Sequence, residues 1–362
     1  LPSVSAVLIV ACPCALLLTS TFTNGIMMKL LSDHGLYLRD ASVIEHLSKT
    51  NHIVFDKTGT LTRGEPALTD VIALGSFSEN EVLTYAAAIE VGSEHPLGEA
   101  IVKGARQRDL TIPSLSQFEG IAGHGIRGSV NNKEVLLGNR RLFQRESVDI
   151  KAAEQLMISL EGSGKTAMLI GLENQLIGIV AVADTLKPEA QEAISQLKGI
   201  NVEVVMLTGD NQRTADSIAK QLGIDRVIAE VLPSDKAKVI KDLQKQGKVV
   251  AMVGDGVNDA PALAAADIGI AIGSGSDVAK ETGGIILVKN DVRDVVAGIN
   301  LSRITMRKIK QNLFWAFIFN ATGIPLAALG YLSPMLAGSA MALSSFCVLS
   351  NALLLKRWRP SH

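Results

Sequence analysis

A short acidic and hydroxyl-bearing segment follows an apolar run near the start of the chain. Residues 53–55 predict the end of a buried parallel strand, and the next five residues are Asp56, Lys57, Thr58, Gly59 and Thr60. Open α/β sheets bind their ligands at the carboxyl ends of the strands. At such a position the carboxylate of Asp56 can attack a phosphorus atom and form an aspartyl-phosphate. Gly59 lets the backbone turn close to a phosphate, and the two threonines offer hydroxyl and N–H groups to phosphate oxygens or a metal.

Two further apolar runs end in polar clusters. Residues 202–207 are followed by Thr208-Gly209-Asp210-Asn211, and residues 249–253 by Gly254-Asp255-Gly256-Val257-Asn258-Asp259. Strands that alternate with helices predict a parallel sheet with crossover connections. We therefore expect these clusters to meet Asp56 at one edge of an α/β sheet.

The predicted edge can support transfer of a phosphoryl group to Asp56. Asp56, Asp255 and the carbonyl of Thr58 can hold Mg²⁺, which needs only one or two protein carboxylates besides phosphate and water. Lys236 can neutralise charge on the phosphoryl oxygens, and Thr208 and Asn258 can donate hydrogen bonds to the same oxygens. Asp259 can orient Lys236 or the water shell of the metal, and Asp210 can contact the nucleotide.

The sequence Asp-Lys-Thr-Gly-Thr-Leu-Thr at residues 56–62 resembles the phosphorylation motif of the P-type ATPases, ion pumps that pass through an aspartyl-phosphate. The resemblance implies a haloacid-dehalogenase-like phosphorylation domain. Soluble phosphatases of that fold usually carry a second Asp two residues after the nucleophile, where this chain has Thr58. Without that carboxylate the phosphoenzyme should persist, which favours a pump over a membrane-tethered phosphatase.

Residues 64–183 are expected to form an inserted α+β domain that binds the nucleotide, with helices over 79–90 and from about 95 to 107. A His-Pro motif marks this domain in the family, so the resemblance assigns Glu94 to the exocyclic amine of adenine and His95 to stacking on the ring. The further ATP contacts that the resemblance implies are Gly123, Gly125, Gly138 and Asn139.

The segment Gly-Ser-Gly-Lys-Thr at residues 162–166 looks like the end of a Walker A loop. Ser159 stands where that loop requires a further glycine. We therefore predict a turn before a strand at residues 167–170, with Lys165 near the nucleotide.

The composition predicts a membrane protein of two or three domains. The 362 residues are 47% hydrophobic with a mean hydropathy of +0.28, and residues 1–28 and 311–355 contain no charged side chain. Because a spanning helix needs about 20 apolar residues, the first stretch predicts one span and the second predicts two, with a break near 330–334. Basic residues flank the second stretch on both sides, so both of its ends should be cytoplasmic. The net charge of −1 gives no reason to expect nucleic acid, and cysteines confined to apolar stretches argue against a secreted disulfide framework.

The first apolar stretch contains Cys12-Pro13-Cys14, in which the proline breaks the helix between two potential thiolate ligands. Such a pair suits Cu(I) or zinc, and the motif is similar to the one that marks heavy-metal P-type pumps. In the copper subgroup a Tyr-Asn pair and a Met-x-x-Ser-Ser motif complete the membrane site. Asn320, Met341 and Ser345 match these motifs, whereas Phe319 replaces the tyrosine.

Zinc and cadmium pumps carry a Lys and an Asp in the last two spans, where this chain has no charge. We therefore predict ATP-driven transport of Cu(I) or Ag(I), with a Zn(II), Cd(II) or Co(II) pump as the alternative. A membrane metal-binding protein without catalysis is a further hypothesis.

The predicted domains are a metal-site helix at 1–30, a phosphorylation domain at 31–63 and 184–300, a nucleotide-binding domain at 64–183, and spans at 311–332 and 334–355. The actuator domain of the family and its earlier spans are not found, so we expect a fragment or half of a split pump that can be phosphorylated but does not cycle. The expected setting is a bacterial inner membrane with cytoplasmic catalytic domains. The expected partners are ATP, lipid, and a copper chaperone or the missing half of the pump.

Overall fold

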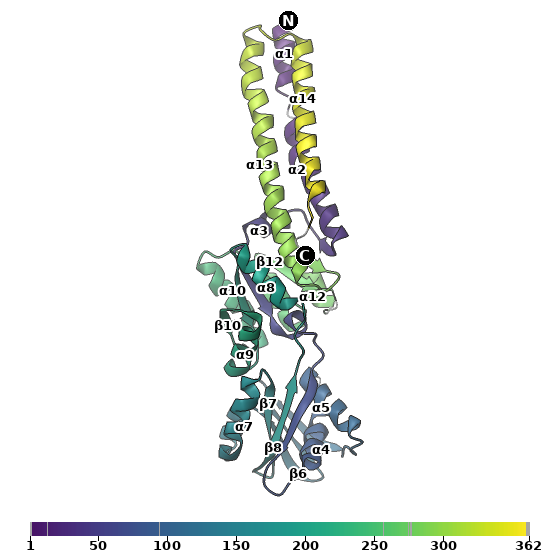
Figure 1. Cartoon of the computed structure of the whole chain (residues 1–362), viewed down its shortest axis with the longest axis vertical. Helices are drawn as coiled ribbons and strands as arrows, with labels where there is room; N and C mark the ends of the chain where they lie inside the picture. Colours follow the sequence, from purple (N-terminus) through teal and green to yellow (C-terminus); the bar gives the residue numbers. More distant parts are fainter. Residues whose placement is uncertain are drawn as a thin grey trace.

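The computed structural model describes residues 2–12, 14–93, 95–255, 257–273, 275 and 277–359. The molecule is elongated, with a helical bundle at one end, a seven-stranded sheet in the middle and a six-stranded sheet at the other end (Figure 1). The chain passes between these parts several times, so each part is built from segments that are distant in the sequence.

The seven-stranded sheet has the order β1-β13-β12-β11-β2-β9-β10. Every neighbouring pair is parallel except β1 with β13. At its centre β2 (His52–Asp56) lies between β11 (Val250–Gly254) and β9 (Glu203–Leu207), and every residue of β2 and β11 is buried. The register pairs Phe55 with Val253 and Asp56 with Leu207, so the polar residues that follow the three strands meet at one edge. The predicted α/β parallel sheet is confirmed.

The remaining strands of this sheet are β1 (Leu36–Leu38), β10 (Arg226–Ile228), β12 (Ile268–Ile272) and β13 (Ile285–Leu287). Its helices are α3 (Val43–Lys49), α8 (Ala190–Gly199), α9 (Gln212–Leu222), α10 (Lys236–Lys245), α11 (Ala260–Ala265) and α12 (Asp277–Thr282). Helix α8 begins at Ala190, after a connecting segment at residues 184–188 that follows β8. The backbone there is already paired, because Leu186 bridges Thr62 and the N–H of Lys187 donates to the carbonyl of Leu61 over 2.9 Å.

The six-stranded sheet is antiparallel, with the order β3-β8-β7-β6-β5-β4. Its strands are β3 (Ala67–Ala73), β4 (Leu115–Ile121), β5 (Gly125–Val130), β6 (Lys133–Gly138), β7 (Thr166–Leu172) and β8 (Gln175–Ala183). Its helices are α4 (Glu79–Glu90), α5 (Pro96–Gln107), α6 (Arg140–Arg145) and α7 (Lys151–Gly162). The paired strands β3 and β8 lead the chain into and out of this domain, which is therefore an insertion, as predicted.

Four helices form the bundle: α1 (Pro2–Val10), α2 (Cys14–Asp33), α13 (Arg293–Ala328) and α14 (Pro334–Leu353). Two helical stretches of the described chain, Ser3–Asp33 and Pro334–Arg357, are long and apolar enough to cross a membrane. The third predicted span, at 311–332, falls mainly on the outer part of α13 and is not one of these two. Helix α13 is continuous over 36 residues, so it joins the bundle directly to the seven-stranded sheet (Figure 1).

Candidate active site and nucleotide-binding face

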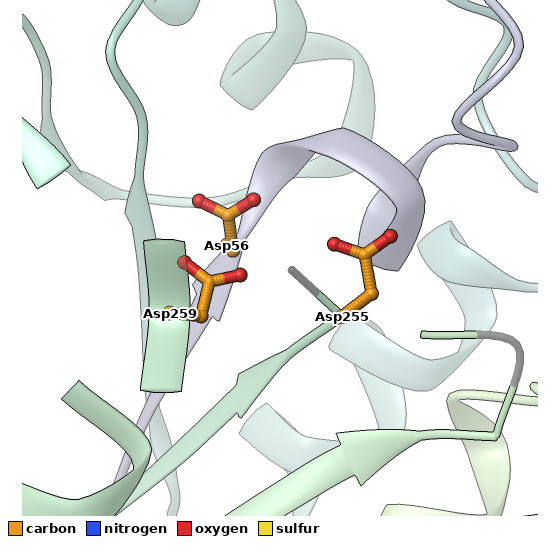
Figure 2. A group of neighbouring side chains, drawn as sticks. All are labelled: Asp56, Asp255 and Asp259. Carbon is orange, nitrogen blue, oxygen red and sulfur yellow. The ribbon is translucent and has the colours of Figure 1, made fainter. Parts of the chain in front are cut away.

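Three carboxyl groups gather at the carboxyl edge of the seven-stranded sheet. Asp56 ends β2, Asp255 directly follows β11, and Asp259 ends the short 3₁₀ helix Val257–Asp259. One oxygen of each lies within 4.8 Å of one oxygen of the other two (Figure 2). The sheet register thus brings together residues that are about 200 positions apart in the chain, as the strand-end pattern predicts.

The ammonium group of Lys236, the first residue of α10, lies between two of these acids. Its Nζ donates to Asp56 Oδ1 over 2.6 Å and to Asp259 Oδ1 over 2.7 Å, and all three side chains are buried. Burial by itself lowers the pKa of Lys236, but the two carboxylates outweigh burial and raise the pKa above its usual value. Lys236 is therefore a fixed positive charge beside Asp56.

The acids are nevertheless in excess over this cation. Burial, and then the charge of Asp259, raises the pKa of Asp56, and Lys236 offsets only part of that rise. Burial and Asp259 likewise raise the pKa of Asp255 to about 6, and the nearby charge of Lys187 opposes the rise. Because the raised pKa values show that these buried carboxyl groups ionise unfavourably, the site is suited to binding a further cation.

Thr60 and Gly59 shape the loop around this pocket. Thr60 is fully buried, and its Oγ1 has no hydrogen-bond partner in the described part of the chain. Gly59 has a φ of +71°, and a Cβ added there would lie 1.7 Å from Asp255 Oδ2. The loop therefore passes directly over the Asp255 carboxylate, and it carries one buried hydroxyl without a partner among the described residues. The oxygen-rich donor set and this orphan hydroxyl fit a hard cation together with a phosphate group.

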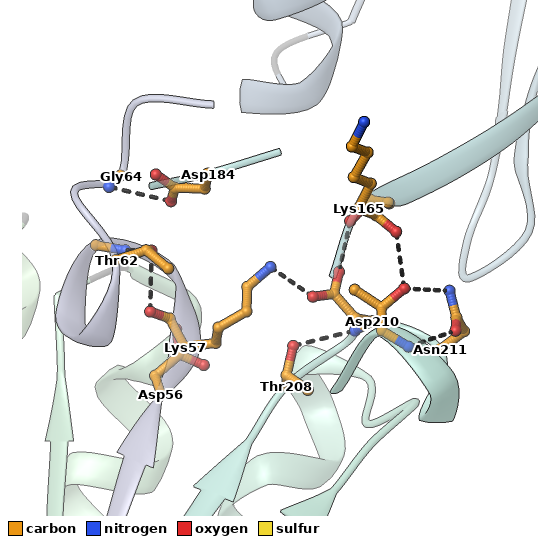
Figure 3. A network of polar contacts seen from close by, with 12 residues as sticks. Asp56, Lys57, Thr62, Gly64, Lys165, Asp184, Thr208, Asp210 and Asn211 are labelled. Carbon is orange, nitrogen blue, oxygen red and sulfur yellow. Dashed lines mark hydrogen bonds and ion pairs between the residues drawn. The ribbon is translucent and has the colours of Figure 1, made fainter. Parts of the chain in front are cut away.

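A second network lies beside the nucleophile loop (Figure 3). Lys57 forms an ion pair with Asp210 in which both side chains are about nine-tenths buried, and the N–H of Asp210 donates to Thr208 Oγ1 over 3.1 Å. Asp210 also accepts a hydrogen bond from Thr166 Oγ1 of the inserted domain over 3.2 Å. The carboxylate expected to contact the nucleotide is thus already engaged by protein groups, and it links the nucleophile loop to the inserted domain.

The other residues predicted for this edge are less engaged. Asn258 is exposed in the short 3₁₀ helix, and Thr58 is half-buried with an extended backbone (φ −73°, ψ 130°). Their predicted roles toward phosphate and metal stay predictions. Lys187, which sequence reasoning missed, places its charge near Asp255, and burial lowers its pKa.

On the inserted domain, the four residues Gly123, Gly125, Gly138 and Asn139 form one structural unit. Gly125 pairs with Gly138 across β5 and β6, and a Cβ added to either would lie 2.2–2.3 Å from a backbone carbonyl oxygen. Asn139 Nδ2 donates to the Gly123 carbonyl over 2.8 Å, and its side-chain oxygen caps α6. Close backbone packing therefore requires Gly125 and Gly138, independently of any contact with ATP.

His95 directly precedes α5, the second helix of this domain. Glu94 lies outside the described residues. His95 is the N-cap of α5, where its Nδ1 accepts the N–H of Leu97 over 3.2 Å. His95 is exposed, and partial burial lowers the pKa of its ring, so the ring is neutral near pH 7. A neutral, exposed ring held by a helix cap is available to stack on a flat base.

Sequence reasoning missed Glu90, the last residue of α4. Glu90 is 7% exposed, its Oε2 has no hydrogen-bond partner among the described residues, and this oxygen lies 2.3 Å from where a Cβ on Gly98 would be. Burial raises its pKa to about 7, although a hydrogen bond from Ser93 lowers it in part. A glutamate that directly follows four consecutive buried residues, 86–89, was the available signal.

The predicted metal residues lie in the bundle. Cys12 lies between α1 and α2; Pro13 and the Cys14 side chain are outside what the structure describes. Met341 packs against a cluster that includes Ala6 and Val10 of α1, so α1 lies beside α14. Asn320 and Ser345 are half-buried, and the neighbouring Ser344, not chosen from the sequence, has a buried Oγ without a partner in the described chain.

Comparison with known proteins adds three kinds of similarity. Residues 50–267 match the family model of haloacid dehalogenase-like hydrolases. The chain is 49% identical to a copper-exporting P-type ATPase of Bacillus subtilis and 48% identical to a probable copper-exporting P-type ATPase of Mycobacterium tuberculosis, with 97% and 98% of this chain covered. It spans only 44–46% of the length of these relatives.

Two solved structures are also similar. A zinc-transporting PIB-type ATPase has a TM-score of 0.71 at 38% identity, covering 96% of this chain and 56% of that one. The catalytic domain of the CPx-ATPase CopB-B has a TM-score of 0.58 at 30% identity, covering 75% of this chain and 98% of that one.

Proposed function

This chain belongs to the heavy-metal P-type ATPases, and its catalytic region is a haloacid dehalogenase-like hydrolase. We propose that Asp56 takes the γ-phosphoryl group of ATP. We propose that this transfer drives a soft monovalent metal ion across a bacterial inner membrane. The ion is Cu(I) or Ag(I), and the catalytic domains face the cytoplasm. The observation that carries the proposal is the buried contact of Asp56 with Lys236 at an edge that also holds Asp255 and Asp259.

In the proposed transfer, a carboxylate oxygen of Asp56 attacks the γ-phosphorus. The bond from that phosphorus to the β,γ-bridging oxygen breaks, and ADP leaves with its electron pair. Lys236 favours the ionised form of this carboxylate and then faces the phosphoryl oxygens, and the buried Thr60 Oγ1 is a further candidate hydrogen-bond donor. Mg²⁺ held by Asp56 and Asp255, with the Thr58 carbonyl, supplies charge neutralisation on the transferring group when it is bound.

The lifetime of the intermediate follows from position 58. Thr58 has no carboxyl group to act as acid and base toward water, so hydrolysis of the aspartyl-phosphate has no internal catalyst at that position. A stored phosphoenzyme is what a pump requires, because it must outlast a rearrangement of the membrane helices.

We place the adenine at Glu90 and His95. The orphan Oε2 of Glu90 offers an acceptor for the exocyclic amine, and the neutral His95 ring offers a stacking surface. We keep Gly125 and Gly138 as proposed backbone contacts of the nucleotide, although the space beside their Cα atoms is filled by the paired strand and by Leu142.

The proposed ion site uses the break at Cys12 and Cys14, with Met341, Asn320 and Ser345. Thiolate and thioether ligands favour Cu(I). The absence of charge in residues 311–355 disfavours a divalent ion, which needs a compensating carboxylate. The similarity to copper-exporting relatives is also greater than that to the zinc-transporting structure, at 49% against 38% identity. A protein that donates Cu(I), or the part of the pump that this chain does not include, would act as partner.

Radiolabelled ATP tests the proposal on the detergent-solubilised chain. We expect an acid-stable, hydroxylamine-sensitive phosphoprotein, loss of label in Asp56→Asn, and full label in the control Asp216→Asn on the exposed face of α9. An Asp56→Asn chain that still labels, or steady turnover of small phosphate esters, would overturn the assignment. For the ion, Cu(I) and Ag(I) should raise labelling and Zn(II) should not; the reverse would assign a divalent metal.

A further inference from the structure

The turn at residues 162–166 lies on the phosphorylation domain although its sequence belongs to the inserted domain. Two side chains of α9 hold it: Ser217 Oγ donates to the Gly162 carbonyl over 3.0 Å, and Thr214 Oγ1 donates to the Lys165 carbonyl over 2.9 Å. Gly164, with a φ of +79°, is close enough that an added Cβ would lie 3.4–3.6 Å from Gln221, Ile218 and Ser217. The turn therefore packs on α9 along about two helical turns.

This turn is not a phosphate-binding loop. A Walker A loop follows a strand and opens a helix, so that the N–H groups of the helix face the phosphates. Here the order is reversed, because the turn follows helix α7 and opens strand β7. Lys165 is also engaged elsewhere: its Nζ donates to Asp70 Oδ2 of the inserted domain over 2.6 Å.

Contacts on both sides of the turn extend this interface. Before it, Glu161 is 1% exposed, accepts two hydrogen bonds from Arg140 of its own domain, and pairs with Arg213 of α9 at 3.4 Å. After it, Thr166 donates to Asp210, whose other carboxylate oxygen pairs with Lys57 next to the nucleophile. The turn is thus connected through Asp210 and Lys57 to the loop that carries Asp56.

We propose that α9 is a contact surface, called the seat below, that holds the nucleotide-binding domain at the correct distance from Asp56. In this proposal Thr214 and Ser217 are positioning residues for phosphoryl transfer. The inference rests on the proposed function. The inserted domain joins the phosphorylation domain covalently only where the chain enters β3 and leaves β8, so two short segments alone would permit rotation. The α9 contacts lie at the end of α7 and at the start of β7, where Thr166 pairs with Val182 near the exit of β8, and this additional non-covalent contact restrains the rotation.

The expected effect is on the rate of transfer and not on nucleotide affinity. Because all the proposed adenine contacts lie within the inserted domain, loss of the seat leaves them intact. A misplacement of about 1 Å between the γ-phosphorus and the nucleophile can cost about a hundred-fold in rate. Thr214→Val combined with Ser217→Ala removes both hydroxyls with little change in shape.

The test is single-turnover labelling of the full chain at saturating [γ-³²P]ATP, with ATP affinity measured separately. We expect the double variant to label about ten- to a hundred-fold more slowly, with ATP affinity within about two-fold of wild type. Thr214→Ser with native Ser217 keeps both hydroxyls and should label normally. Asp216→Ala, on the solvent-facing side of α9, is the matched control.

Hydrogen exchange at the amides of residues 163–165 provides a readout that does not depend on catalysis, and it should be faster in the double variant. A double variant that labels at the wild-type rate, or that loses ATP affinity and rate together, would overturn the positioning role. Failure of the proposed function gives a different result. The wild-type chain would then show no hydroxylamine-sensitive label, independently of the hydrogen-exchange rates of residues 163–165.

Discussion

The two ends of the proposed ATP site are built on different physical grounds. At the sheet edge, Lys236 makes buried, charge-assisted contacts of 2.6–2.7 Å with Asp56 and Asp259, Asp255 lies within 4.8 Å of both acids, and strand register fixes their positions. At the nucleotide-binding face, the proposed contacts are a neutral imidazole, a carboxyl group whose pKa is raised to about 7, and glycines required by strand packing. The edge should therefore tolerate almost no change, whereas the nucleotide-binding face should lose affinity in small steps.

Gly59→Ala should give the largest effect. The new Cβ would lie 1.7 Å from Asp255 Oδ2, so either the loop or the Asp255 carboxylate must move away from Asp56. We expect a fall in phosphoenzyme formation of about a thousand-fold or more, the scale of losing an electrostatic group from an active site. Acid-quenched labelling with radioactive ATP measures it.

Gly247→Ala is the matched control for backbone strain. Gly247 has a similar φ of +77°, but nothing lies within 4 Å of an added Cβ. The cost there is only that of a left-handed residue, about 1–2 kcal/mol, so the melting temperature should fall by a few degrees while labelling remains complete. If both alanine variants lose label equally, the contact with Asp255 is not what makes Gly59 necessary.

Glu90→Gln should change how stability depends on pH. The pKa of Glu90 is about 7 in the folded chain against an ordinary value of 4.5, so the folded state binds more protons between these values. The stability that protonated Glu90 contributes is complete below pH 4.5 and is lost as the pH rises through 7. Relative to wild type, the glutamine variant should gain about 3 kcal/mol between pH 4.5 and 8, because its amide never ionises.

Thermal unfolding of both chains across this pH range measures the difference. Asp56 and Asp255 also have raised pKa values, but they are present in both chains and cancel. Glu99→Gln, on the exposed side of α5, is the control and should follow the wild-type curve. ATP affinity should survive in Glu90→Gln, which keeps an oxygen acceptor, and fall in Glu90→Leu; equal affinity in both variants would remove Glu90 from the adenine site.

The difference between the two regions also explains what the sequence could predict. Asp56, Thr208 and Asp255 follow apolar strands directly, so local pattern and sheet topology suffice to bring them together. Glu90 was missed because its burial depends on how α4 packs against α5, and the apolar run at residues 86–89 before it indicates a buried helix end without specifying that packing. The ion pair between Lys57 and Asp210 depends on side-chain direction at a loop, which strand order does not specify.

Helix α13 also shows that local sequence does not reveal tertiary contacts. The basic residues from 303 to 310 suggest a boundary between two segments, yet the helix is continuous through them. Arg303 does not face open solvent there, because it donates to the carbonyls of Ile200 and Thr50 over 2.8 and 3.0 Å. Those carbonyls lie near the starts of β9 and β2, so a charge that predicts a boundary in fact holds the helix against the central strands.

His95 should give the smallest effect, and it separates two roles of one ring. His95→Ala removes both the helix cap and the stacking surface, whereas His95→Asn keeps a capping oxygen and removes only the ring. If the ring stacks on adenine, both variants should lose about five- to ten-fold in ATP affinity, because an aromatic contact contributes about 1 kcal/mol. The alanine variant should in addition lose about 1 kcal/mol of stability through the cap. Equilibrium nucleotide binding and thermal unfolding measure the two losses, and a His95→Asn chain with wild-type affinity would leave the cap as the only role of His95.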